Sequence, residues 1–246
     1  MRWLLSNTRN RLTFAAKNPT YALRSLFREV TLADERFLST ITGMPARRIR
    51  SFLEEPLATP SFAKCLRDAE EVSKTAPVAS ADLYAKKVLV QYAAIRAFAP
   101  EVVVETGVAN GVSSAYLLLA MQKNGRGKLY SIELGDTSYL PPGKAPGWMV
   151  PQELRDRWSL QIGDSRALLP RMLNELATVD VFIHDSLHTY DQMLWEYRAA
   201  YPHIRAGGLL FSDDAAWNPA FPEFTREVSA KNAAILRGVG FLQKNA

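Results

Sequence analysis

Five apolar runs in the middle of the chain each end in a carboxylate. The runs are EVVVE (ending at Glu105), KLYSIE (Glu133), SLQIGD (Asp164), DVFIHD (Asp185) and LLFSDD (Asp213 and Asp214). Aliphatic and β-branched residues without polar alternation are typical of strands that are buried on both faces. The pattern therefore predicts five buried strands, at 101–105, 128–134, 158–163, 179–184 and 207–212.

Helical periodicity lies between these runs. The spacing of apolar residues predicts helices at 112–123, 165–177 and 189–201, so strands and helices alternate along the chain. Such alternation predicts an α/β fold with a Rossmann-like, doubly wound and mostly parallel sheet. The tail AAILRGVGFLQKNA (233–246) predicts an antiparallel hairpin of two short strands that turn at Gly238 and Gly240.

The first part of the chain has a different, irregular helical pattern. Residues 1–75 are broken by prolines, and one helix in ADERFLSTITG is expected to stop at Gly43. A clearer helix is expected to begin at Ser80 and to end before Pro100. The sequence thus predicts a helical appendage at 1–79, a lid or an oligomer arm, and a main domain at 80–246.

A long connection interrupts the regular alternation. Residues 135–154 contain four prolines and three glycines, which is too much chain for a simple link between two strands. Long loops at the ligand edge of a sheet are usually functional. We expect a substrate-covering loop that leads into a short helix.

Charge and composition bear on the location of the protein and on its possible partners. The net charge of +5 is unevenly distributed: residues 1–50 hold ten basic and three acidic residues, a net of +7, and the rest of the chain has a net of −2. This segment could meet an anionic membrane surface, a nucleic acid or an acidic partner, or it could be a solvated helical face. No stretch reaches the roughly 20 apolar residues of a membrane span, and no secretory signal is expected. The single cysteine, Cys65, fits a reducing compartment, so a cytoplasmic location is expected.

The strand-end carboxylates are the candidate chemistry. In an open parallel sheet, ligands bind beyond the carboxyl ends of the strands. The first run leads into a turn with the pattern E-x-G-x-x-x-G, from Glu105 through Gly107 to Gly111. This pattern is not the pyrophosphate-binding one, and an acidic residue there would suit a ligand amine. Glu133 could accept hydrogen bonds from both hydroxyls of a ribose, and Asp164, with Ser165, could pair with an adenine amino group.

Taken in this order, these motifs resemble those of class I S-adenosylmethionine-dependent methyltransferases. HDSLHTYDQMLWEY (184–197) and GGLLFSDD (207–214) further resemble small-molecule O-methyltransferases related to the macrolide-sugar and catechol enzymes, which act with a metal. The resemblance covers roughly residues 80–246. It implies cofactor contacts from seven residues: Glu105, Gly107, Gly111, Ser113, Glu133, Asp164 and Ser165.

The same resemblance implies the rest of the site. Asp185, Asp213 and Asp214 would hold Mg²⁺ or another divalent cation, and His188 would be the general base. The acceptor would be a small hydroxylated molecule, no nucleic-acid partner is expected, and a homodimer is left open.

Other interpretations of these residues remain open. Asp213 and Asp214 could cap the following turn, and His184, His188 and His203 could be hydrogen-bonded residues of the fold. Alternative functions are a metal-independent methyltransferase acting on another acceptor, a nucleic-acid methyltransferase, or a binding protein without turnover. A nicotinamide- or flavin-dependent oxidoreductase would need the pyrophosphate-type glycine turn that the sequence lacks.

Overall fold

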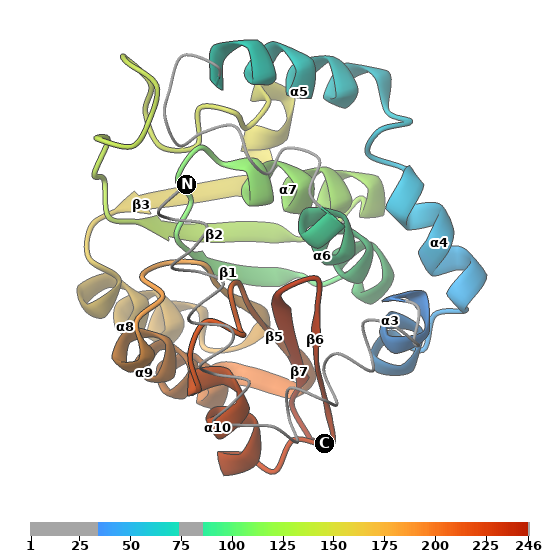
Figure 1. Cartoon of the computed structure of the whole chain (residues 1–246), viewed down its shortest axis with the longest axis vertical. Coiled ribbons are helices and arrows are strands. Elements are labelled where there is room, and N and C mark those ends of the chain that lie inside the picture. The colour runs from blue at the N-terminus through green and yellow to red at the C-terminus, as the bar shows by residue number, and fades with distance from the viewer. Residues whose placement is uncertain (1–33, 74–85, 246) are drawn as a thin grey trace.

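One seven-stranded sheet forms the centre of the protein (Figure 1). The structure, a computed structural model, describes residues 34–73 and 86–245. The strand order is β3-β2-β1-β4-β5-β7-β6. The strands are β1 (Val102–Thr106), β2 (Lys128–Glu133), β3 (Trp158–Ile162), β4 (Val179–His184), β5 (Ile204–Ser212), β6 (Asn232–Leu236) and β7 (Val239–Gln243). The first five strands run parallel, and β7 pairs antiparallel with both β5 and β6, so the predicted fold class is confirmed.

Helices follow the strands as predicted. The three helices between strands begin and end within one residue of the expected positions, whereas β5 begins three residues earlier than expected. The α-helices are α3 (Asp34–Thr42), α4 (Ala46–Glu54), α5 (Pro60–Ser73), α6 (Lys86–Phe98), α7 (Val112–Asn124), α8 (Ser165–Leu176), α9 (Tyr190–Ala200) and α10 (Ala220–Glu227). Two 3₁₀ helices, η1 (Gln152–Arg157) and η2 (Tyr201–His203), precede β3 and β5.

Helices pack on both faces of the sheet, and successive side chains of a strand point to opposite faces, so the side chains on each face are buried. In β1, Val103 belongs to the hydrophobic core shared with α6 and α7, while Val104 belongs to the core shared with α8, α9 and α10. In β4, Val181 and Phe182 divide in the same way. This division between two cores explains why the strand sequences are apolar throughout.

The helices α3 to α5 pack on the same core as α6 and α7. Leu38, Phe52 and Phe62 are buried in it. Glu55, just after α4, accepts hydrogen bonds from Tyr92 and Arg96 of α6. Helix α3 ends at Thr42, before Gly43, as expected. Residues 1–33 and 74–85, which include the expected helix start at Ser80, lie outside the described residues, so the domain division at residue 79 stays a prediction.

The C-terminal hairpin differs from the prediction in one respect. Arg237 and Gly238 form the turn, both with positive φ, but Gly240 lies within β7, where it pairs with Ser212 and Ile235. A Cβ atom at Gly240 would lie 2.7 Å from the Phe221 ring, so packing explains this glycine. Among the described helices, none has both the length and the hydropathy that a bilayer crossing requires.

Candidate active site

The carboxyl ends of neighbouring parallel strands meet at one edge of the sheet. The ladder continues one residue past β4 and β5: Asp185 N donates to Thr106 O, and Asp213 N donates to His184 O, both at 2.8 Å. These bonds bring the ends of β1, β4 and β5 together. A cavity of about 580 Å³ opens at this edge, and five of the predicted site residues line it: Gly107, Glu133, Asp164, Ser165 and Asp185.

The glycine turn after β1 packs against the protein's own backbone. Gly107 has φ +84°, and a Cβ atom there would lie 2.1 Å from the Asp185 carbonyl oxygen. Gly111 has φ +85°, and its Cβ atom would lie 2.7 Å from Gly147 Cα. The sequence predicted glycines that admit a ligand, but the closest neighbours of these two are backbone atoms of the following loops. Gly107 lines the cavity and Gly111 does not.

Glu105 is not among the residues that line the cavity. Its side chain is fully buried and accepts hydrogen bonds from Ser113, Ser114 and Ser131, at 2.6 to 2.9 Å. Burial raises the pKa of Glu105, and the three hydroxyls oppose that rise. In this structure Glu105 and Ser113 join β1 to α7. Their predicted contact with the methionine part of a cofactor stays a prediction.

Glu133 lines the cavity with both carboxylate oxygens engaged. Oε2 accepts from the backbone N–H groups of Val108 and Ala109 at 2.7 and 2.8 Å, and Oε1 accepts from the Tyr139 hydroxyl at 2.9 Å. Burial, followed by the charge of Glu133, raises the pKa of Tyr139. The Tyr139 hydroxyl therefore already uses Oε1, and Tyr139 was not among the residues predicted from the sequence.

Asp164 and Ser165 lie side by side at the start of α8. Asp164 is exposed and caps the helix by accepting from Arg166 N at 2.8 Å. The Ser165 hydroxyl donates to Glu196 Oε1 at 2.8 Å. Both residues line the cavity, as predicted, and both have protein partners already.

Glu196 of α9 is a buried acceptor that the sequence did not single out. Its carboxylate is fully buried and accepts from Thr106, Ser165, Ser186 and Gln192, and His184 Nδ1 lies 2.6 Å from Oε2. Burial alone would raise the pKa of Glu196, but His184 and the hydrogen-bond donors lower it to about 2. A signal was present, because position 196 falls on the apolar stripe of α9, where an unpaired carboxylate is rare.

The role of His184 follows from the same contact. Its ring is completely buried beside Glu196, which agrees with the alternative of a hydrogen-bonded residue of the fold.

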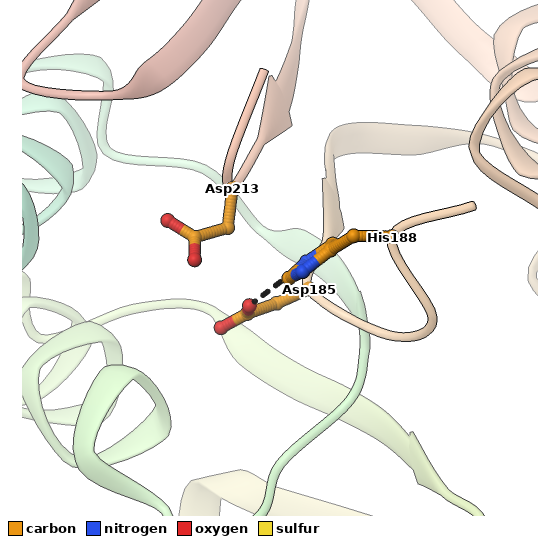
Figure 2. A group of neighbouring side chains, drawn as sticks. All are labelled: Asp185, His188 and Asp213. Carbon is orange, nitrogen blue, oxygen red and sulfur yellow. Dashed lines mark ion pairs between the residues drawn. The ribbon is translucent and has the colours of Figure 1, made fainter. Parts of the chain in front are cut away.

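A second cluster lies beside the cavity, where β4 and β5 end. Asp185, His188 and Asp213 each offer a ligand atom, and these atoms lie within 4.8 Å of one another. Figure 2 shows the Asp213 carboxylate across from Asp185, with the His188 ring beside Asp185. His188 Nε2 is 3.6 Å from Asp185 Oδ1, and His188 Nδ1 is 3.7 Å from Asp214 Oδ2. The cluster therefore includes His188. Asp214 lies outside it, near the other ring nitrogen, Nδ1.

The neighbouring ionisable groups of this cluster shift one another's pKa values. Burial and the Asp213 carboxylate raise the pKa of Asp185. Burial works against protonation of His188, but the neighbouring carboxylates raise its pKa. Two carboxylates that face each other favour a shared proton or a cation, and oxygen donors with one imidazole suit a divalent metal ion. The residues present fit such an ion.

A lysine also reaches this cluster. Lys87, in the first turn of α6, forms an ion pair with Asp213, with Nζ 3.0 Å from Oδ2. Burial would raise the pKa of Asp213, but the Lys87 ammonium and His188 lower it. No motif in the sequence pointed to Lys87, because it lies 126 positions before its partner.

The loop 135–154 is fixed to the glycine turn at its second half. Gly147 N donates to Ala109 O at 2.8 Å, and the Trp148 indole donates to the Asn110 side chain at 2.7 Å. The short helix expected at its end is η1. The first half brings Tyr139 to the cavity. Coverage of a substrate by this loop stays a prediction.

Comparisons with known proteins agree with this fold. Residues 104–215 match a protein family described as "Methyltransferase domain". No curated protein sequence matches the chain.

Three similar solved structures are described as methyltransferases or O-methyltransferases. A protein from Klebsiella pneumoniae, assigned provisionally to the O-methyltransferases, is 16% identical, with a TM-score of 0.55 over 74% of this chain and 90% of that one. A methyltransferase from Podospora anserina with bound S-adenosylhomocysteine is 14% identical, with a TM-score of 0.55 over 82% and 95% of the two chains. The O-methyltransferase TomG from Streptomyces achromogenes is 15% identical, with a TM-score of 0.54 over 74% and 90%. At these identities the likeness establishes the fold alone, and the family match over residues 104–215 agrees with the predicted resemblance to methyltransferases.

Proposed function

We propose that this chain, which carries a methyltransferase domain, transfers a methyl group from S-adenosylmethionine to a hydroxyl of a small molecule. One observation carries the proposal: Asp185 lines the cavity and also belongs to the cluster with His188 and Asp213. A cofactor in the cavity would thus lie directly beside the groups that could activate an acceptor oxygen. A hydroxyl acceptor also agrees with the descriptions of the similar structures as O-methyltransferases.

In the proposed arrangement, the cofactor binds in the cavity. Glu133 would bind the ribose hydroxyls once Tyr139 moves aside, and Asp164 and Ser165 would lie at the adenine. Glu105, Gly107, Gly111 and Ser113 would support the methionine part, with Glu105 acting through the turn. The predicted cytoplasmic location and homodimer stay predictions.

The chemistry requires alignment and removal of one proton. The acceptor oxygen forms a bond to the methyl carbon while the bond from sulfur to that carbon breaks, leaving S-adenosylhomocysteine. His188 would take the acceptor proton, and the carboxylates of Asp185 and Asp214, on either side of its ring, would stabilise the resulting imidazolium. Most of the rate gain in such a displacement comes from positioning and electrostatic stabilisation.

A divalent cation fits the same cluster. Asp185 and Asp213 would hold it, with Asp214 nearby, and it would lower the pKa of the acceptor hydroxyl. Chelation should then abolish methyl transfer, and return of magnesium should restore it. Full activity in chelator would remove the cation from the proposal and leave the rest intact. Metal-independent transfer is the second candidate, and the ion pair of Lys87 with Asp213 favours it.

Equilibrium binding tests the cofactor directly. Calorimetry should detect S-adenosylhomocysteine binding to the full chain and no binding of NAD. Glu133→Gln should weaken the binding of S-adenosylhomocysteine about tenfold or more, because hydrogen bonds to a charged group contribute roughly 1.5–3 kcal/mol. The control is Glu101→Gln, a half-exposed carboxylate paired with Arg126, which should bind normally. Binding of NAD alone would refute the function, and an unchanged Glu133→Gln variant would refute the placement of the ribose.

A further inference from the structure

Lys87 places an ammonium group beside the carboxylates of the cluster. Its Nζ lies 3.0 Å from Asp213 Oδ2, the Lys87 side chain is 26% exposed and that of Asp213 is 6% exposed. The pair joins the first turn of α6 to the end of β5. Because Asp213 is almost closed to solvent, water screens this contact weakly.

The lysine also acts beyond its partner. Its charge lowers the pKa of Asp213, and it opposes the rise in the pKa of Asp185 that burial and the Asp213 carboxylate cause. Lys87 and His188 both act on these two carboxylates. A lysine ammonium is ordinarily charged at neutral pH, whereas an imidazole titrates near neutrality.

An ammonium and a divalent cation compete for the same carboxylate. Asp213 belongs to the group of potential ligands, and its Oδ2 already contacts Lys87. A divalent ion bound to Asp213 would lie only a few ångströms from Nζ, and two positive charges repel strongly at that distance in a partly buried site. The four-carbon stem of lysine is flexible, so Nζ can withdraw.

We propose that Lys87 is a tethered cation that sets the metal affinity of this site: it neutralises Asp213 when no metal is bound and must leave that carboxylate for a divalent ion to bind. The inference rests on the proposed function only for the place of the cation. It concerns the binding of the ion and makes no assumption about the acceptor. Lys87 is here a residue that positions and balances the ligands.

Metal binding by the full chain tests the inference without turnover. Mn²⁺ would be titrated into wild type, Lys87→Met and Lys87→Arg, with calorimetry and the paramagnetic signal of free Mn²⁺ as readouts. Lys87→Met keeps the apolar stem and removes the charge, so it should bind Mn²⁺ roughly tenfold tighter or more. Lys87→Arg keeps the charge and should stay close to wild type. The control is Lys64→Met, which removes a surface lysine paired with Asp68 and should change nothing.

Further outcomes locate the effect. Asp213→Asn in the Lys87→Met background should lose the added affinity, because the tighter binding requires the Asp213 carboxylate. Equal or weaker Mn²⁺ binding by Lys87→Met, with a far-ultraviolet spectrum like that of wild type, would overturn the inference. Absence of Mn²⁺ binding in all variants would overturn it too. S-Adenosylhomocysteine titrations of the same samples report separately on the proposed function.

Discussion

Replacement of Glu196 by glutamine offers a quantitative test of the structure. The substitution keeps the volume of the side chain and removes the charge that His184 and four other groups contact. The folded-state pKa of Glu196 is about 2, against an ordinary value of 4.5. A difference of this size corresponds to roughly 3 kcal/mol of folding free energy at neutral pH, since one pKa unit is about 1.4 kcal/mol.

The dependence on pH has a definite sign. Because the folded-state pKa lies below the unfolded one, the stabilisation by Glu196 is complete above about pH 4.5 and disappears as the pH falls toward 2. Glu196→Gln should therefore lose roughly 3 kcal/mol of unfolding free energy at pH 7. The gap between the variant and wild type should narrow as the pH falls below 4.5.

Urea unfolding followed by tryptophan fluorescence measures both effects. The control is Glu227→Gln, which removes an exposed carboxylate paired with Arg198 and should leave the unfolding midpoint unchanged. A loss below about 1 kcal/mol at pH 7, or a gap that stays constant from pH 7 to pH 3, would refute the assignment of Glu196 as a charged buried acceptor.

Three other predictions concern the site. Gly107→Ala should abolish measurable S-adenosylhomocysteine binding in calorimetry, because its Cβ atom would lie 2.1 Å from a backbone oxygen, and normal binding would contradict this packing. His188→Ala should lower kcat about 10²–10⁴-fold while the affinity for S-adenosylhomocysteine stays within a few fold, and an unchanged kcat would give the residue a structural role. Tyr139→Phe should tighten S-adenosylhomocysteine binding about two- to tenfold, since it removes the hydroxyl that competes for Glu133, and weaker binding would show that Tyr139 contributes to the bound state instead.

The sheet could be predicted because buried strands and their helices have local signatures. The run that ends at Asp185 is apolar because its strand is buried on both faces. This pattern can be recognised from the sequence of that strand alone. The position of Gly240 could not be predicted, because a glycine required by the Phe221 ring and a glycine in a turn look alike in sequence. The ring lies on α10, a contact that only the folded chain creates.

Part of the site could also be predicted from local sequence patterns. Carboxylates at strand ends share an edge by topology, so Glu133, Asp164 and Asp185 could be grouped from sequence. Side-chain direction is a different matter. Glu105 points toward α7, and Lys87 meets Asp213 only because α6 packs beside the sheet. Such long-range contacts leave no local pattern.

The contact between Gly107 and the backbone of Asp185 has a thermodynamic consequence. No side chain separates the turn after β1 from the loop after β4, so a small shift in either one displaces the other. A ligand bound on one side of this contact should therefore alter the affinity for a ligand on the other side. Thermodynamic linkage requires the two effects to be equal. We expect S-adenosylhomocysteine to change the dissociation constant of Mn²⁺ by the same factor as Mn²⁺ changes that of S-adenosylhomocysteine.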